Sequence, residues 1–320
     1  MKAIAQDAYG TTDMLSYTDV PTPDAGQDGV LLRVRAAGVD PSVWHFMTGE
    51  PLVARLALGL RRPRERVRGW DVSGIVEAVG PRVTEFRPGD EVFGTVPGSF
   101  AEFACAPASK LQLKPVNLSF EQAAALPISG MTALNGLRDS GRIEAGQHVL
   151  IIGAAGGVGH LAVQLAKHYG AEVTGVCAGP AVEFVTDLGA DHVIDYTART
   201  LTGRYDLIFD MAGNRPLPLL RSLLTDAGTL VLGGGEGGGR FFGGLGRSMR
   251  AQLLSLLSRQ RLRSLLSLPK PETLRALAEL ATAGALAPRV TLTYALAEAA
   301  VAIDDLAAGH ARGKSVISVG

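Results

Sequence analysis

The stretch His148–Gly159, HVLIIGAAGGVG, decides how the rest of the chain is interpreted. Its first part, Val149–Ile152, is a short apolar, β-branched run, the composition of a strand buried on both faces in a parallel sheet. A glycine-rich turn follows, and the next residues, HLAVQLAKHYG, carry apolar side chains at helical spacing and end at Gly170. Strand, glycine turn and helix in this order predict the opening of a dinucleotide-binding unit.

The glycines of this turn have a physical reason in such a unit. They let the backbone turn tightly and approach a pyrophosphate, which then lies at the positive end of the helix. The alternative is a purely structural turn, because any tight connection from a strand to a helix favours glycine. A second strand is predicted at Glu172–Cys177, where a dinucleotide-binding unit requires it, and this favours the binding interpretation.

Composition limits the classes of function. A chain of 320 residues suits two domains, and its formal net charge of zero gives no electrostatic case for nucleic acid. Two cysteines, Cys105 and Cys177, cannot build a disulfide framework or a cysteine-rich zinc lobe. The start, MKAIAQDAYG, lacks the apolar run of a signal peptide, and no stretch approaches 18 uninterrupted apolar residues. We therefore expect a soluble, cytoplasmic protein without a membrane partner.

The first part of the chain, residues 1–121, is predicted to be rich in short strands separated by Pro/Gly turns, which suggests a small barrel-like domain. The predicted strands are Val30–Val34, Gly74–Val79, Glu91–Thr95 and Phe100–Ala106. A helical pattern then begins after Ser119, a possible cap, and Pro127 should break or kink it.

The middle of the chain alternates between strand and helix, the pattern of a doubly wound α/β sheet. We predict strands at 149–152, 172–177, 192–195, 206–211 and 229–232, and helices at 160–169, 180–188 and 217–224. The stretch 241–270 is basic and has leucine pairs at helical spacing, and Pro271 starts another helix that ends near Gly284. The tail returns to strand, helix and strand.

Eight motifs in this order resemble those of the medium-chain dehydrogenase/reductase superfamily, most closely its zinc-free quinone oxidoreductase (zeta-crystallin-like) branch. They are AAGVDPSVWHFMTG, GWDVSGIVEAVG, FRPGDEVFG, GSFAEFACAP, ALPISGMTA, GAAGGVG, LGADHVIDY and HARGKSVISV. The resemblance covers essentially the whole chain. It implies a GroES-like β-barrel domain made of residues 1–121 and 288–320, a Rossmann domain of residues 122–287, and a cleft between them where cofactor and substrate meet.

The resemblance also allows a check for the catalytic zinc that many members of the superfamily hold. At the three positions of its ligands this chain has Asp40, Trp70 and Ile128. Zinc needs three protein donors and an open position, and indole and isobutyl groups are not ligands, so we predict no metal. Without a Lewis acid, hydride delivery from a reduced nicotinamide to a quinone, or to the β-carbon of an enone or enoyl substrate, is the favoured reaction.

The segments that the resemblance places at the cleft contain the catalytic candidates. His45 would protonate the developing enolate or phenolate; the alternatives are a structural hydrogen bond and a proton taken from water. Ser42 matches the hydroxyl of a proton relay in zinc enzymes. Asp40, Trp70 and Ile128 are expected to line the substrate pocket, although a structural hydrogen-bonding role is the favoured interpretation of Asp40 and Asp71.

The expected cofactor is NADPH, with NADH possible. NAD-specific sites place a carboxylate at the end of the second strand, and here that position reads Val176-Cys177-Ala178. The resemblance suggests that Tyr196 touches a 2′-phosphate and that Arg312 or Lys314 supplies charge. The residues expected to contact the cofactor are Thr132, Ala155, Gly156, Gly157, Val158, Ala178, Tyr196, Ala212, Gly213, Gly233, Gly234 and Lys314.

We therefore predict a zinc-independent NAD(P)H-dependent reductase that acts on a small carbonyl or quinone substrate and forms a homodimer. One alternative is a biosynthetic enoyl or keto reductase that acts on a polyketide or carrier-bound intermediate. Its support is the arginine-rich stretch Arg61–Arg68, otherwise a solvated surface, and the unusual segment 51–66, which we expect to border the substrate pocket. An alternative of another class is a non-catalytic NADPH-binding protein with a crystallin-like or assembly role.

Overall fold

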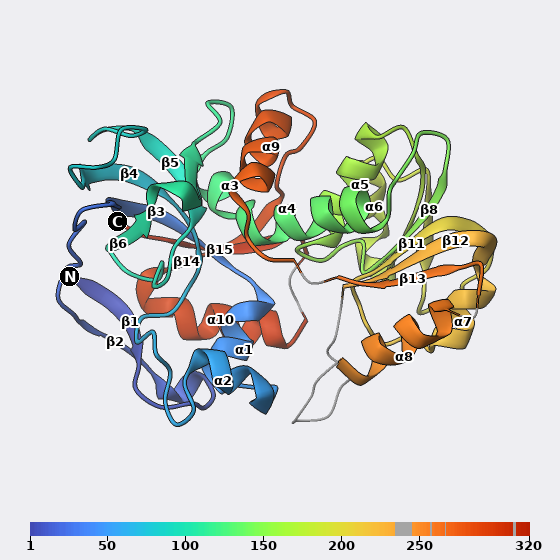
Figure 1. The fold of residues 1–320 in the computed structure, drawn as a ribbon, viewed down its shortest axis with the longest axis horizontal. Helices are drawn as coiled ribbons and strands as arrows, with labels where there is room; N and C mark the ends of the chain where they lie inside the picture. Colours follow the sequence, from blue (N-terminus) through green and yellow to red (C-terminus); the bar gives the residue numbers. More distant parts are fainter. Residues whose placement is uncertain (234–244, 257, 266, 310–311) are drawn as a thin grey trace. The chain divides into compact units, whose positions relative to one another are not determined.

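The computed structural model describes residues 1–320 except 234–244, 257, 266 and 310–311 (Figure 1). Contacts within the chain divide it into two compact units. Unit 1 comprises Met1–Met131 and Pro269–Gly320, and unit 2 comprises Thr132–Leu268. This division assigns residues 122–131 and 269–287 to unit 1, whereas we had expected domain boundaries at 121/122 and 287/288.

Unit 1 is built on strands from both ends of the chain. A seven-stranded sheet has the order β14-β15-β3-β4-β5-β7, and β6 pairs with β3. Its strands are β14 (Val290–Ala295), β15 (Lys314–Ser318), β3 (Gly29–Val39), β4 (Asp71–Val79), β5 (Glu91–Thr95), β7 (Leu111–Leu113) and β6 (Phe103–Pro107). Strands β1 (Lys2–Gln6) and β2 (Leu15–Asp19) form an antiparallel pair. The C-terminal strand β15 runs antiparallel to β3, with Ser315 opposite Val39.

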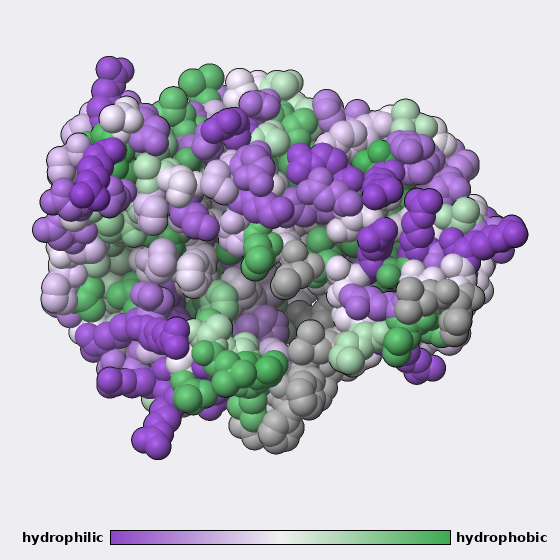
Figure 2. Space-filling model, in the orientation of Figure 1, coloured by the Kyte–Doolittle hydropathy of each residue, from purple (hydrophilic) through white to green (hydrophobic). Residues whose placement is uncertain are grey.

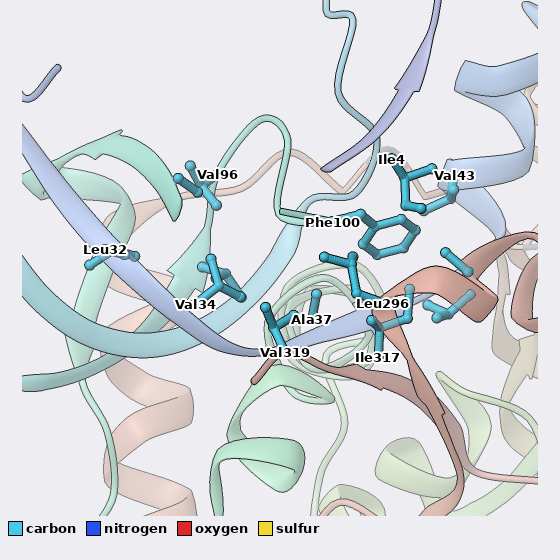
Figure 3. Close-up of a cluster of buried hydrophobic side chains, with 14 of the residues drawn as sticks. Ile4, Leu32, Val34, Ala37, Val43, Val96, Phe100, Leu296, Ile317 and Val319 are labelled. Atoms are coloured by element: carbon cyan, nitrogen blue, oxygen red, sulfur yellow. The ribbon is translucent and has the colours of Figure 1, made fainter. Parts of the chain in front are cut away.

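The helices of unit 1 pack around an aliphatic core. They are α1 (Pro41–Thr48), α2 (Arg55–Leu58), α3 (Phe120–Ala124), α9 (Pro271–Thr282) and α10 (Ala299–Ala307). Figure 3 shows side chains from distant segments, among them Ile4, Val43, Phe100 and Ile317, packed together in this core. Helix α1 packs against α10, so the core fixes the position of α1 within unit 1.

A break in the helical pattern after Ser119 follows from local chemistry. Ser119 and Gln122 form a reciprocal capping box at the start of α3. Because Pro127 has no N–H and disfavours helix at the preceding residue, α3 ends before it and α4 (Pro127–Leu134) begins with it. Both expectations from the sequence are confirmed here.

Unit 2 contains a six-stranded parallel sheet with the order β10-β9-β8-β11-β12-β13. Its strands are β8 (His148–Ile152), β9 (Glu172–Cys177), β10 (His192–Asp195), β11 (Tyr205–Asp210), β12 (Leu224–Leu232) and β13 (Arg261–Ser264). If β8 is numbered first, this is the order 3-2-1-4-5-6 of the Rossmann fold. The predicted doubly wound sheet is confirmed.

Helices cover both faces of this sheet. In Figure 1, α5 (Gly159–His168) and α6 (Val182–Asp187) lie on one side, and α7 (Leu217–Ser222) and α8 (Leu245–Leu256) lie on the other. Most predicted strands agree with the structure within one residue, but β13 lies in a stretch for which we predicted only helix. Its sequence, RLRS, is too polar and too short to be recognised as a buried strand.

The surface of unit 1 includes an apolar patch. On the face drawn in Figure 2, an apolar patch lies over α2, where Leu56 and Leu60 are each 68% exposed. Among the helices of the described part of the chain, none is long and apolar enough to cross a membrane.

Candidate functional site

The glycine turn of unit 2 has the geometry that its sequence predicts. Gly153 has a φ of +84°, a backbone conformation that favours glycine. A Cβ atom on Gly159 would lie 2.0 Å from the carbonyl oxygen of Gly153, so the strand and helix pack too closely for any other residue. At Gly156 the nearest atom to such a Cβ is 3.4 Å away, which is an ordinary contact.

The turn lies where the order of the strands reverses. Strands β8 and β11 are neighbours, and their connections lead to opposite halves of the sheet. A Cβ on Gly153 would lie 3.5 Å from the backbone nitrogen of Ala212, so the loops that follow these two strands are close. In open α/β sheets, ligands bind at the carboxyl ends of the strands at such a switch point.

Most of the residues expected to contact the cofactor lie along this edge of unit 2. Ala155, Gly156, Gly157 and Val158 form the loop between β8 and α5, and Ala178 follows β9. Tyr196 follows β10, Ala212 and Gly213 follow β11, and Gly233 follows β12. Thr132 lies on α4, and Gly234 lies outside the described residues.

The residues of this edge fit a dinucleotide. Helix α5 starts at Gly159, and no side chain caps its N-terminus, although the N–H of His160 already donates to the carbonyl of Gly156 at 3.0 Å. Glycine at 156 leaves room for another molecule to approach the backbone. The N–H of Gly156 donates to the carbonyl of Gly153 at 3.0 Å, so a pyrophosphate would lie against this loop at the positive end of the helix dipole without that N–H.

In unit 1, the catalytic candidates lie at the start and along α1. Asp40 caps the helix: its Oδ1 accepts a hydrogen bond of 2.8 Å from the N–H of Ser42, and the residue is only 2% exposed. His45 is exposed, and its Nδ1 lies 3.1 Å from the carbonyl oxygen of Glu50. Because a carbonyl only accepts, Nδ1 carries a proton in this contact, and Nε2 is the ring nitrogen left for another partner.

A buried ionic cluster joins β4, β15 and α4. The Nζ of Lys314 lies 3.7 Å from Asp71 Oδ2 and 3.3 Å from Ser129 Oγ, and the N–H of Ile128 donates to Asp71 Oδ1 at 3.0 Å. Burial raises the pKa of Asp71 to about 8; Asp40 adds to the rise, and Lys314 and the Ile128 N–H oppose it. These bonds favour the structural interpretation of Asp40 and Asp71.

This cluster bears on our expectation that Lys314 contacts the cofactor, which stays a prediction. Lys314 is 2% exposed, and its ammonium is enclosed within unit 1 beside Asp71. To reach a phosphate, the ammonium would have to leave both Ser129 Oγ, at 3.3 Å, and the neighbouring Asp71.

Unit 1 also contains a pocket of about 250 Å³. Its described lining includes Val43 and Phe46 of α1, Trp70, and part of the segment between α2 and β4. The rings of Phe46 and Trp70 are 5.3 Å apart between centroids. Thus Trp70 and the 51–66 segment do border a pocket, whereas His45 is not among its described lining residues.

The donor set does not fit a catalytic zinc. Asp40 is already used as a helix cap, and Trp70 and Ile128 carry no group that binds zinc. Elsewhere in the described ranges, no three His, Cys, Asp or Glu side chains are grouped closely enough to hold a metal ion.

Sequence reasoning singled out the stretch Arg61–Arg68 but did not predict the contacts of Arg68, and it missed the contacts of Arg215 and Arg247. Arg68 lines the pocket of unit 1 and is 5% exposed; burial lowers its pKa, and its Nη1 donates to the carbonyl of Phe46 at 3.3 Å. In unit 2, Arg247 pairs with the fully buried Asp210, with Nη2 2.7 Å from Oδ2, and Arg215 lies over the ring of Tyr196. Each of these contacts joins residues that are not neighbours in the sequence, so a local sequence pattern does not predict them.

Comparison with known families agrees with this geometry. Residues 26–116 match the model of the alcohol dehydrogenase GroES-like domain, and residues 188–317 match a model described as zinc-binding dehydrogenase. The structure of the quinone oxidoreductase from Coxiella burnetii matches 100% of this chain and 99% of its own, with 30% identity and a TM-score of 0.87.

Two curated plant proteins are also similar to this chain. The quinone-oxidoreductase homolog of Spinacia oleracea chloroplasts is 34% identical, over 72% of this chain and 74% of that protein. The chloroplastic NADPH-dependent alkenal/one oxidoreductase of Arabidopsis thaliana is 37% identical, over 67% of this chain. The chain spans less than two thirds of the length of the first curated relatives it matches, 58% for the Arabidopsis protein.

The two-unit fold, the glycine turn at the switch point and these matches define the class: the chain belongs to the medium-chain dehydrogenase/reductase superfamily. Within the superfamily it is a member of the quinone oxidoreductase branch. The GroES-like and Rossmann folds expected from the resemblance are thereby confirmed.

Proposed function

We propose that the chain is an NAD(P)H-dependent reductase that adds a hydride to a quinone or to the β-carbon of an α,β-unsaturated carbonyl compound. One observation carries the proposal: the glycine turn between β8 and α5 lies at the switch point of the sheet, in a chain of the quinone oxidoreductase branch. The bound nicotinamide would supply the hydride, and a proton from a side chain or water would complete the saturated ketone or the hydroquinone.

The pocket of unit 1 is the proposed place for the acceptor. A cavity of about 250 Å³ lined by Val43, Phe46 and Trp70 suits a small molecule with a flat, apolar body. Its size is below the range of roughly 300–1,000 Å³ that is usual for larger ligands. The aromatic rings would orient a conjugated system and exclude water from it.

The proton donor in this proposal is His45 or water. Since Nδ1 of His45 donates to the Glu50 carbonyl, the imidazole presents Nε2 to a substrate. It donates a proton from Nε2 only in its cationic form, when both nitrogens carry hydrogen.

The cofactor in this proposal is NADPH, and no metal takes part. The end of β9 reads Cys177-Ala178-Gly179 and has no carboxylate that would hold a ribose 2′-hydroxyl. A similar protein from Arabidopsis is named as NADPH-dependent, which is consistent with this choice. Zinc independence follows from the donor chemistry at Asp40, Trp70 and Ile128.

The assembly and the location are part of the proposal. The strands β10 and β13 end the sheet of unit 2, and we propose that two chains dimerise through such an edge. Light scattering during gel filtration would measure the mass; a monomer at micromolar concentration would contradict the dimer. The cytoplasmic location stays a prediction, because the Arabidopsis relative is named as chloroplastic.

Isotope transfer tests the proposed reaction. The protein is incubated with NADPH that carries deuterium at C4 and with a simple enone, and the product is analysed by mass spectrometry and NMR. We expect one deuterium at the β-carbon of the saturated ketone. Binding of NADPH without product from enones or quinones would instead favour a non-catalytic role.

A further inference from the structure

Three loops at the carboxyl edge of the unit 2 sheet meet in space. The N–H of Tyr196, after β10, donates to the carbonyl of Cys177 at the end of β9, at 3.1 Å. From the loop after β11, the guanidinium carbon of Arg215 lies 5.3 Å from the centroid of the Tyr196 ring. The contact therefore connects the two halves of the sheet across the switch point.

The loop that carries Arg215 is held in place by a buried network. The Nη2 of Arg247 lies 2.7 Å from Asp210 Oδ2 and donates to the carbonyl of Arg215 at 2.9 Å. Asp210 Oδ1 accepts from the N–H of Gly213 at 3.1 Å, and Asp210 is fully buried. The backbone of Arg215 is thus fixed between the end of β11 and helix α8.

The side chain of Arg215 is available to a ligand. It is half-buried, and no carboxylate within the described residues forms an ion pair with it; its Nε is a buried nitrogen without a hydrogen-bond partner, so a ligand would meet the guanidinium through its Nη groups. Asp195, beside this edge, uses Oδ1 to accept from the N–H of Thr197 at 2.9 Å and from its hydroxyl at 2.6 Å, and its Oδ2 lies beside Gly179, where a Cβ would be 2.7 Å from it. Tyr196 is 48% exposed, so its hydroxyl is also accessible.

We propose that Arg215 joins Tyr196, for which the resemblance already implies this contact, in binding the 2′-phosphate of NADPH, and that Arg215 sets the cofactor preference; this inference rests on the proposed function. A guanidinium pairs with phosphate through two parallel N–H bonds, and an arginine near this edge accommodates the 2′-phosphate in NADP-binding Rossmann folds. The ring of Tyr196 holds the guanidinium by a cation–π contact. The positive charge for the 2′-phosphate thus comes from Arg215 in the loop after β11, because the loop after β9 contains no basic residue.

Binding measurements on single variants test this inference without any acceptor. Dissociation constants for NADPH and NADH are measured by nucleotide fluorescence, and 2′,5′-ADP and 5′-AMP serve as competitors. For Arg215→Met we expect NADPH and 2′,5′-ADP to bind about 10- to 100-fold more weakly, with NADH and 5′-AMP unchanged within about two-fold. Tyr196→Phe keeps the ring and should cause a smaller loss of about two- to five-fold for NADPH only.

The matched control is Arg204→Met. Arg204 is another arginine of unit 2; it is exposed, precedes β11 at the opposite edge of the sheet and pairs with Asp226 at 2.8 Å. It should leave both affinities unchanged. An Arg215→Met protein that keeps the wild-type preference, or that loses NADPH and NADH equally, would overturn the inference. A wild-type protein that binds neither dinucleotide would instead overturn the proposed function.

Discussion

At the scale of single residues, Gly159 and Gly156 have different roles in the glycine turn: one allows close packing and the other allows a ligand to approach. The missing side chain of Gly159 lets α5 pack on the loop of Gly153, whereas a Cβ on Gly156 would make only an ordinary contact of 3.4 Å with the Gly153 carbonyl oxygen. The first role concerns folding and the second concerns the approach of a ligand.

Alanine substitutions should therefore have different effects at these two positions. Gly159→Ala forces a methyl group against a backbone carbonyl, and we expect it to lower the free energy of unfolding by about 1–3 kcal/mol or more. Gly156→Ala should fold like the wild type but bind NADPH more weakly. Urea unfolding and nucleotide titration measure the two effects. Equal loss of stability in both variants would contradict this assignment.

The proposed role of His45 as proton donor is tested by the kinetics of a variant. If its imidazolium is the proton donor, His45→Gln lowers kcat by about 10²-fold, within the range of general acid catalysis, and changes KM little. His192→Gln, an exposed histidine 3.1 Å from Glu172, is the control. An unchanged kcat in His45→Gln would assign the proton to water.

At the scale of elements, the ionic cluster of Asp71 and Lys314 joins β4 to the C-terminal strand β15 and to the start of α4. The sequence contains both residues in recognisable motifs, but their pairing depends on bringing together positions more than two hundred residues apart. Hydrophobic periodicity gives no information on such a pair. The sequence analysis therefore had only the resemblance to use for Lys314, and the resemblance suggests a contact with the cofactor.

The cluster predicts a pH-dependent stability. The pKa of Asp71 rises on folding from its ordinary value of 3.8 to about 8, so the folded state holds an extra proton between these values. The stabilisation is complete below the lower value and is lost as the pH rises through the higher one, with a slope of up to about 1.4 kcal/mol per pH unit. Urea unfolding of wild type and Asp71→Asn from pH 5 to about 8 should show this slope only in the wild type. Parallel curves would contradict it.

How far the sequence predicts elements depends on what stabilises each one. The strands β8, β9 and β11 are buried on both faces, so their apolar runs predicted them closely. Strand β13 was not predicted, because RLRS pairs with β12 through its backbone and lacks an apolar run. The Arg215–Tyr196 contact was also missed, since a cation–π pair between two loops has no sequence period.

At the scale of the whole molecule, the resemblance of eight motifs predicted the superfamily, because each motif has a structural reason within one fold. This chain differs from the zinc enzymes of the superfamily at the three positions where the resemblance places their zinc ligands. Asp40 caps a helix, and Trp70 lines a pocket and carries no group that binds zinc.

This difference predicts that the activity does not depend on a metal. After dialysis against a strong chelator, NADPH oxidation by an enone should be unchanged, and added zinc should not raise it. Metal analysis of the purified protein should find far less than one zinc per chain. Loss of activity on chelation, with recovery on adding zinc, would show that donors outside these positions hold a metal.

The most direct test of the account is a fluorescence titration of the purified protein with NADPH and with NADH, followed by addition of an enone or quinone to the same cuvette. We predict saturable binding that is tighter for NADPH, and oxidation of the bound nucleotide after the acceptor is added. If neither nucleotide binds, the assignment of the Gly153–Gly159 turn as a dinucleotide site is wrong, and the proposed function fails with it.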